Sequence, residues 1–338
     1  MNKAKEELGV LQRCELDLAF GTDENDFECK VAVQDHCCEA GYFIFVDGTE
    51  YGGIVDSVQI DTENNEVTYF GRTWHGILAS KIILPLQSGE KTSLLTLATS
   101  DANGSLVDKY LKISGDAGKC IQFILDRCGL SSLFRVASEP DTAVISGYQF
   151  HRYTDAYTGI CKMLKSAGQK LRISLKDGMA ELWYAKQYDF SQDDEFTPDG
   201  LSFVLRKKYN TVNHLICLGQ GELADRMVVH LYADQSGNIS RTQTLTGKDE
   251  YAQTFDYPNV ESEEELINSG TDQLKTLWAQ NELSISFDPV DDVYDLGDIV
   301  GAYDNVTKTA VAAEIIKKIV TVKNGITTIS YKVGEKIG

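Results

Sequence analysis

The sequence has few prolines, no closely paired cysteine motif and no long apolar run. Only 5 of its 338 residues are proline. Hydrophobic residues make up 42% of the sequence, which is enough to form a folded core without disulfide bonds or structural metal ions. It lacks C-x-x-C, the spacing typical of thiolate zinc sites. No stretch approaches the ~18 consecutive apolar residues that a membrane-spanning helix needs. We therefore expect a folded chain with no thiolate zinc site and no membrane anchor.

Clustered positive charge is also lacking. The formal net charge is −19, from 51 acidic and 32 basic residues. The longest basic run, Arg206-Lys207-Lys208, lies between apolar segments and is interpreted as a solvated strand edge. Nucleic-acid binding needs clustered Lys and Arg to neutralise phosphates, so we expect no specific nucleic-acid binding.

The cysteines have the pattern of free thiols. Cys120, Cys128 and Cys161 fall on apolar positions of predicted helices, which favours small buried side chains. The adjacent Cys37 and Cys38 cannot easily pair with each other. The N-terminal segment lacks the apolar core and cleavage site of a signal peptide, so we expect synthesis and folding in a reducing bacterial cytoplasm. The full set is Cys14, Cys29, Cys37, Cys38, Cys120, Cys128, Cys161 and Cys217.

Both ends of the chain are rich in predicted β-strands. Residues 1–103 alternate apolar and polar side chains as antiparallel strands do, with a tight-turn pair at Asp47-Gly48. Residues 201–338 do the same, apart from one helix that begins with a capping box of Ser262 and Glu265. We predict a β-rich domain at each end.

The middle of the chain, residues 104–200, mixes helices and strands. Helical periodicity over 104–113, over 116–128 and after Thr154 predicts three helices, the last of them capped by Thr154. A hairpin follows around Asp177-Gly178. We predict a small α/β domain, which makes the whole chain mainly β with an α+β insertion.

One glycine motif in the sequence is a candidate for a nucleotide-binding site. Gly219-x-Gly221-x-x-Ala224 follows an apolar strand pattern, as dinucleotide-binding fingerprints do. That fingerprint needs a helix of about ten residues after the glycines. Here Met227–Tyr232 already has the pattern of a strand, so we expect an antiparallel loop and no cofactor.

The histidines fit no catalytic spacing. None of them forms an i, i+4 pair, and there is no G-x-S-x-G nucleophile motif. Each lies in or beside a strand-like or turn-like segment, which favours structural roles. A cysteine–histidine dyad stays open, because such partners meet in space and not in sequence. The five are His36, His75, His151, His214 and His230.

The acidic segment Val293–Asn305, VYDLGDIVGAYDN, raises the question of a metal or catalytic site. Its aspartates do not follow the register of a twelve-residue calcium loop. Apolar residues lie between the acids, which favours a strand whose polar members face water. Asp295 and Gly297 favour a turn where this strand begins. We therefore expect a turn and a strand start, with no metal and no catalytic residue.

Three segments, taken together, resemble hub proteins from the tails of long-tailed phages. Val67–Pro85, VTYFGRTWHGILASKIILP, is similar to a strand followed by G-R-x-x-x-G-L-L-x-x-R-I-I in that family. Asn210–Gly221 is similar to its N-x-V-x-V-x-G-x-G strand and loop. Val293–Val300 is similar to its Y-D-L-G-D-I-V strand, and the end of the chain fits its Asn-Gly hairpin and Y-x-V-G finish. Relatives include the N-terminal domain of the siphophage tail-associated protein and baseplate hubs of contractile tails and tail-like bacteriocins.

The resemblance implies two tail-tube-like β-barrel domains, 1–103 and 201–338, with the α/β domain 104–200 inserted between them. It implies a homotrimer whose six barrels form a ring, joining a sixfold tail tube to a threefold spike or fibre. The implied partners are a tail tube or distal tail protein, a spike or tail-tip protein and the tape-measure protein. The implied location is the baseplate at the tip of a phage, prophage or tail-like particle.

The sequence departs from the family pattern at two positions and in its length. His75 replaces a residue that is usually polar or acidic, and Lys81 stands where Arg is common. The sequence ends at Gly338, whereas many relatives continue into a peptidoglycan hydrolase or a fibre, so we expect other proteins to supply those functions. Three copies would carry −57 formal charges, three times −19, which leads us to expect an acidic bore along which DNA or the tape-measure protein slides.

Two other functions remain as alternatives. A wall-degrading or carbohydrate-binding tail-tip protein should show a catalytic constellation or an aromatic platform, but the three tryptophans are scattered one per region. A nucleotide-binding enzyme depends on the glycine motif alone. We expect no enzyme activity, and we place the interface residues at Arg72, Trp74, Asp295 and Asp298.

Overall fold

The computed structural model describes most of the chain. The described residues are 1–11, 13–22, 24–85, 94, 110–137, 143–192, 202–207, 211–258, 260, 262–278, 281–286, 294–304, 309–323 and 325–335. They belong to two compact units. The first comprises Met1–Leu201, Ser286–Gly301 and Glu314–Val333, and the second comprises Ser202–Ile285, Ala302–Ala313 and Gly334–Gly338.

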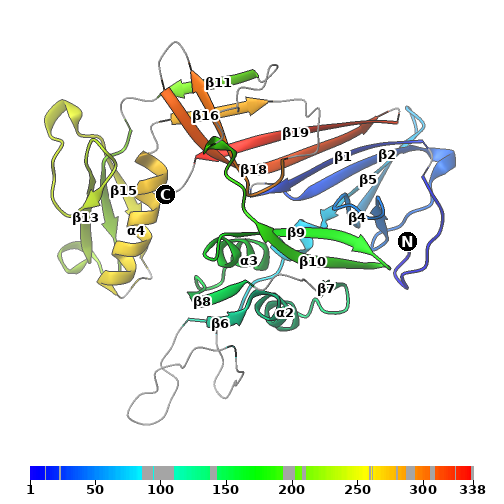
Figure 1. Ribbon diagram of the computed structural model, residues 1–338, viewed down its shortest axis with the longest axis horizontal. Helices are drawn as coiled ribbons and strands as arrows, with labels where there is room; N and C mark the ends of the chain where they lie inside the picture. The colour runs from blue at the N-terminus through cyan, green and yellow to red at the C-terminus, as the bar shows by residue number, and fades with distance from the viewer. Residues whose placement is uncertain are drawn as a thin grey trace, which may run out of the picture. The chain divides into compact units, whose positions relative to one another are not determined.

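The largest sheet has eight strands and curls into a half-barrel (Figure 1). Its order is β17-β18-β1-β2-β5-β4-β3, with β19 paired to β18. The prediction of a mainly β fold with an α+β part is confirmed. The strands are β1 (Cys14–Gly21), β2 (Asp26–Ala32), β3 (Phe43–Phe45), β4 (Gly52–Asp61), β5 (Glu66–Thr73), β17 (Ile299–Asp304), β18 (Thr309–Lys323) and β19 (Ile326–Glu335).

The alternation of residue types decides which face of this sheet is buried. Leu16, Leu18 and Phe20 of β1 are buried, whereas Glu15 and Asp17 on the opposite face are exposed. Burial of such apolar side chains contributes about 1.5–3 kcal/mol each. The period of two along a strand therefore gives the sheet one apolar and one charged face.

The sheet is completed by strands from the far end of the chain. β18 runs antiparallel to β1, with Leu18 opposite Val320 and Leu16 opposite Val322. Strands from residues 1–103 and from residues 201–338 are thus hydrogen-bonded neighbours. The chain-order division at 1–103, 104–200 and 201–338 stays a prediction, and the pairing shows that these stretches share a sheet.

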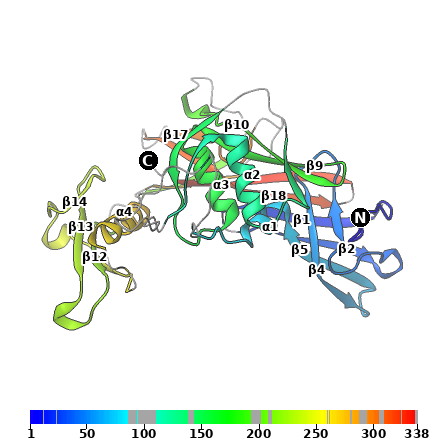
Figure 2. The same ribbon diagram turned by 90° about the horizontal axis from the view of Figure 1, so that it is seen from below.

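Three helices and two small sheets complete the first unit. Helices α2 and α3 lie beside β9 and β10 (Figures 1 and 2), and their apolar side chains form one core with those strands. The helices are α1 (Trp74–Ala79), α2 (Ala117–Arg127) and α3 (Ala156–Lys165). The strands are β6 (Lys112–Asp116), β7 (Phe134–Val136), β8 (Val144–Gln149), β9 (Gln169–Lys176) and β10 (Met179–Lys186), in the orders β6-β8 and β7-β10-β9.

Local signals placed most of these elements correctly, and two details were wrong. The hairpin at Asp177-Gly178 is confirmed: both residues have positive φ, 52° and 70°, which suits a two-residue turn between β9 and β10. Lys112 and Ile113 lie in a strand instead of the predicted helix, and 104–109 lie outside the described residues. The cap of α3 is Asp155 instead of Thr154, because the Asp155 carboxylate accepts the Thr158 N–H at 2.8 Å.

The second unit contains a four-stranded sheet packed against one helix. Leu215 and Leu231 of the sheet and Leu266 and Leu274 of the helix are buried in its core. Ser262 Oγ accepts the Glu265 N–H at 3.5 Å, at the start of that helix. The helix is α4 (Glu263–Trp278), and the strands are β12 (His214–Leu218), β13 (Val228–Ala233), β14 (Ile239–Ser240) and β15 (Ala252–Asp256), with β11 (Ser202–Lys207) paired separately to β16 (Asn281–Ser286).

Candidate functional site: a buried network of charges

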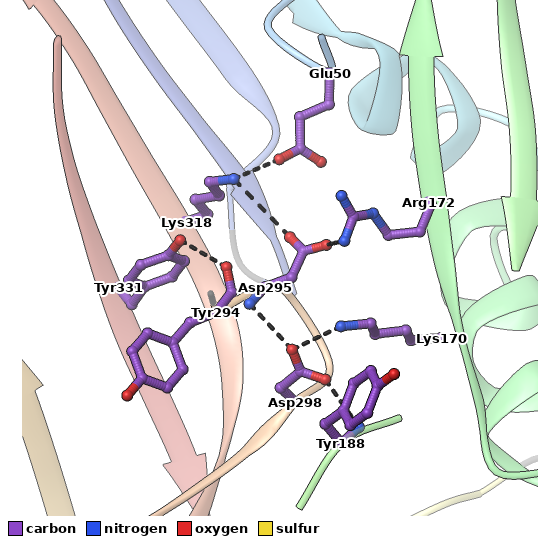
Figure 3. A network of polar contacts seen from close by, with 9 residues as sticks. All are labelled: Glu50, Lys170, Arg172, Tyr188, Tyr294, Asp295, Asp298, Lys318 and Tyr331. Carbon is purple, nitrogen blue, oxygen red and sulfur yellow. Dashed lines mark hydrogen bonds and ion pairs between the residues drawn. The ribbon is translucent and has the colours of Figure 1, made fainter. Parts of the chain in front are cut away.

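The acidic segment forms a tight turn that holds two buried carboxylates (Figure 3). The Asp298 N–H donates to the Asp295 carbonyl at 3.1 Å, and Gly297 has φ +87°, which favours glycine. The Gly297 N–H donates to the Ile315 carbonyl at 2.9 Å, and the Ile315 N–H donates back to the Asp298 carbonyl at 2.8 Å. The predicted turn is thus present, attached to β18 and followed at once by β17.

Asp298 is fully satisfied by neighbours inside the first unit. Its Oδ2 lies 2.6 Å from Lys170 Nζ of β9, and these side chains are only 1% and 7% exposed. Its Oδ1 accepts the Tyr188 N–H at 3.0 Å, and Oδ2 also accepts the Asp295 N–H at 3.1 Å. One carboxylate therefore joins β9, the chain after β10 and the turn itself.

The side chain of Asp295 is held by ion pairs alone. It forms an ion pair with Arg172 of β9, and its Oδ1 lies 3.9 Å from Lys318 Nζ of β18. Neither carboxylate oxygen has a hydrogen bond of good geometry. Because burial of an unpaired carboxylate is strongly unfavourable, these two cations compensate its charge.

Lys318 is the centre of the other half of the network. Its Nζ lies 2.6 Å from Glu50 Oε1, and 5.2 Å and 5.9 Å from the ring centroids of Tyr51 and Tyr331. The Tyr331 hydroxyl donates to the Tyr294 carbonyl at 2.8 Å. Three acids (Glu50, Asp295, Asp298) thus face three bases (Lys170, Arg172, Lys318), and the network has no formal net charge.

Burial and pairing act on these groups in opposite directions. Burial raises the pKa of Asp298, and the Lys170 ammonium opposes that rise. Burial and the neighbouring Glu50 raise the pKa of Asp295, against Arg172 and Lys318. Burial lowers the pKa of Lys318, but Glu50, Tyr331 and Asp295 outweigh it and hold that pKa above its ordinary value.

The expectation that the polar members of this segment face water is wrong for Asp295 and Asp298, while Val293 and Asn305 at its ends lie outside the described residues. Asp295 and Asp298 are buried, because charged partners from β9 and β18 replace water around them. In β9, the apolar residues Leu171 and Ile173 share one face. Lys170 and Arg172 lie on the other face, which the alternation of residue types predicts to be exposed to solvent. One signal in the sequence could have indicated these buried ion pairs. Two lysines lie inside the apolar run EIIKKIVTV (314–322), and a lysine that is buried in such a run needs an acidic partner.

The four predicted interface residues do not form one site. Arg72 lies near the surface and makes a two-point ion pair with Asp56 at 2.8 Å. Trp74 is fully buried in the core beside Phe43. In this conformation only Arg72 of the four can touch another subunit directly, while the other three can act only through the elements that they hold. The interface role itself stays a prediction.

The remaining candidates have structural surroundings. Gly219-x-Gly221 lies in the loop between the antiparallel strands β12 and β13, as predicted, and not at the start of a long helix. His75 is buried, stacked on Phe20 at 4.4 Å, and burial lowers its pKa to about 3. His214 pairs with Glu250 at 2.6 Å and with His230 at 2.9 Å. Among the described residues, no group of three or more His, Cys, Asp or Glu side chains is placed to hold a metal ion.

The network is suited to holding elements together and not to turnover. Its acids are paired with fixed cations, and the Asp298 carboxylate is out of reach of solvent, so no substrate can approach it as the network stands. General acid–base catalysis needs a group within hydrogen-bond reach of its substrate. The arrangement instead joins β9, β18 and the 295–298 turn by charge.

Comparison with known proteins gives a fold but no family. No family model matches the sequence, and no curated protein matches it significantly.

In the described part of the chain, no helix combines the length and apolar character needed to span a membrane.

The similar solved structures are tail proteins of low sequence identity. The prophage MuSo2 43 kDa tail protein from Shewanella oneidensis aligns with a TM-score of 0.54 and 10% identity, over 96% of this chain and 95% of that one. A tail protein from Neisseria meningitidis MC58 aligns with a TM-score of 0.47 and 11% identity, over 95% and 92%. Prophage tail protein gp18 from Listeria monocytogenes EGD-e aligns with a TM-score of 0.45 and 12% identity, over 96% and 88%. The chain therefore shares the fold of the Shewanella prophage tail protein along nearly its whole length.

Proposed function

We propose that this protein is a non-enzymatic structural component of a phage tail or tail-like particle, acting as the hub. In this role three copies form a ring that joins a sixfold tail tube to a threefold spike or fibre at the baseplate. The observation that carries the proposal is the full-length fold similarity to a prophage tail protein, with 96% of this chain aligned. The three sequence segments that resemble tail hubs support the same assignment.

The buried charge network gives this role a physical basis. A ring subunit must keep its sheet and its α/β part in one arrangement while neighbours pull on it. Buried ion pairs add little net stability, but breaking one leaves an uncompensated charge at a cost of about 3–5 kcal/mol. The network therefore penalises any movement of β9 away from the 295–298 turn and β18.

The charged face of the large sheet is our candidate for the bore. β1 and β2 place Glu15, Asp17, Asp26 and Glu28 on this face, together with Lys30. The neighbouring strands add the bases Arg72, Lys317 and Lys323 beside them. Asp17 lies directly opposite Glu28, and like charges in that position destabilise a sheet. Partial burial, Glu28 and Asp26 raise the pKa of Asp17, and Lys30 and Lys317 oppose that rise. An acidic bore would hold DNA or a tape-measure protein weakly and so let it slide.

Two measurements test the hub assignment. Sedimentation equilibrium of the purified chain should give a trimer of about 113 kDa, three times 37.5 kDa. Electron cryomicroscopy of the assembled particle should place this subunit in a ring between the tail tube and the spike. A strictly monomeric chain that is found elsewhere in the particle, or that cleaves peptidoglycan, would contradict the proposal.

A further inference from the structure

Two histidines meet on one face of the sheet in the second unit. Leu215 of β12 and Leu231 of β13 are buried in the core against α4. His214 and His230 are their chain neighbours, so they lie on the opposite face of the sheet. His214 pairs with Tyr232, two residues after His230, which makes the two histidines diagonal neighbours. His214 Nε2 lies 2.9 Å from His230 Nδ1, and His214 is buried while His230 is exposed.

Two contacts fix the orientation of the His214 ring. Glu250, just before β15, places its Oε1 2.6 Å from His214 Nδ1. An ionised carboxylate can only accept a hydrogen bond, so Nδ1 of His214 carries the proton and Nε2 keeps its lone pair. The Tyr232 ring stacks on the His214 ring with 4.3 Å between centroids. His214 therefore directs a lone pair at His230 from a ring that is already held in place.

This arrangement is the one that a metal-binding histidine has. Such a histidine usually donates its other ring N–H to a carboxylate, as His214 does to Glu250. Without a metal, the His230 Nδ1–H donates to His214 Nε2. When that proton moves through water to the Nε2 of the exposed His230 ring, the net charge is unchanged. Both facing nitrogens then have a lone pair directed at one point.

The distance between these nitrogens is close to that of two zinc ligands. Zn–N bonds of about 2.0–2.1 Å in a tetrahedral site place two nitrogen ligands about 3.3 Å apart. His214 Nε2 and His230 Nδ1 are 2.9 Å apart, so the exposed His230 ring must move by only about 0.4 Å. Imidazole suits zinc, copper and nickel, whereas magnesium and calcium select oxygen ligands.

We propose that His214 and His230 form a two-histidine site for a divalent transition-metal ion such as Zn²⁺, with Glu250 as the outer partner that orients His214. No third His, Cys, Asp or Glu among the described residues is placed to join them, so water completes the coordination. Because the ion binds the folded sheet, it should stabilise the second unit. The inference concerns these side chains alone and stands whether or not the chain is a tail hub.

The test is a calorimetric titration of zinc chloride into the metal-free, full-length protein. Cys37→Ser serves as the parent, because it removes an exposed thiol that could also bind zinc. We expect one zinc ion per chain that depends on the histidine pair. His230→Gln should abolish its binding, and Glu250→Gln should weaken the affinity by about 10–100-fold. His151→Gln, at an exposed histidine of the first unit, should leave the affinity unchanged, and magnesium chloride should give no binding.

Thermal melting gives a second readout of the same site. Zinc should raise the melting temperature of the parent protein and leave that of His230→Gln unchanged. The zinc-free variants should have the circular dichroism spectrum of the parent, which separates lost binding from lost folding. Absence of zinc binding by the parent, or an unchanged affinity in His230→Gln, would overturn the proposal. An unchanged affinity in Glu250→Gln would overturn it as well, since the carboxylate would then not orient the ligand.

Discussion

Breaking the Lys170–Asp298 pair should destabilise the first unit far more than breaking a surface pair. Lys170→Met removes the ammonium 2.6 Å from a carboxylate that is 1% exposed. The carboxylate keeps its hydrogen bonds from the Tyr188 and Asp295 N–H groups, but its charge loses its nearest partner. We expect a loss of about 3–5 kcal/mol in the free energy of unfolding.

A double-mutant cycle measures the coupling free energy between Lys170 and Asp298. Asp298→Asn alone leaves the buried Lys170 ammonium without this carboxylate partner. Lys170→Met combined with Asp298→Asn removes both charges of the pair. We therefore expect the double variant to be less destabilised than the two single variants added together, by at least about 2 kcal/mol. Arg72→Met and Asp56→Asn supply the matched control, since that pair is 42% and 39% exposed. Its coupling should be no more than about 1 kcal/mol.

Urea unfolding followed by tryptophan fluorescence measures these values. Trp74 and Trp183 lie in the first unit and Trp278 in the second, so a Trp278→Phe background reports on the unit that holds the network. Each variant needs an unchanged m-value for the comparison to hold. A coupling no larger than that of the surface pair would refute the claim that the buried charges hold β9 to the turn.

Three further outcomes follow from single sites. His75 is buried with a pKa of about 3, so between that value and its ordinary 6.5 the unfolded chain binds a proton that the folded chain does not. Stability should therefore fall as pH drops from 6.5 towards 3, by up to about 1.4 kcal/mol per pH unit, and His75→Phe should flatten this slope in urea titrations at several pH values. Gly53→Ala would place its Cβ 1.9 Å from the Arg72 carbonyl oxygen in β5, so we expect urea unfolding to show a loss of about 1–3 kcal/mol or more in the free energy of unfolding. Gly48→Ala is the control, because its Cβ meets no atom within 4 Å. It should lose only about 1 kcal/mol, from backbone strain at φ +71°. Asp155→Ala removes the cap of α3 and should lower the melting temperature of the first unit by the equivalent of about 1 kcal/mol, with Asp155→Asn retaining most of the stability.

Local patterns in the sequence were enough to predict most of the elements. Alternation of Leu16, Leu18 and Phe20 predicts β1 with the correct buried face, because the period of a strand is fixed by its backbone. The Asp177-Gly178 hairpin and the turn at Gly297 are predictable because glycine and aspartate tolerate the positive φ angles found there. The antiparallel loop at Gly219 and Gly221 follows from the strand pattern that begins so soon after it.

Tertiary structure alone decided how distant segments meet. The pairing of β18 with β1 joins residues about 300 positions apart, and no local pattern specifies a strand's partner at that separation. The same holds for charge: Asp298 and Lys170 look solvated in sequence, since acids and lysines usually are, and only the fold places them 2.6 Å apart out of water. The residue types fix which side chains carry charge, whereas burial, which depends on all segments at once, decides whether that charge is solvated or paired.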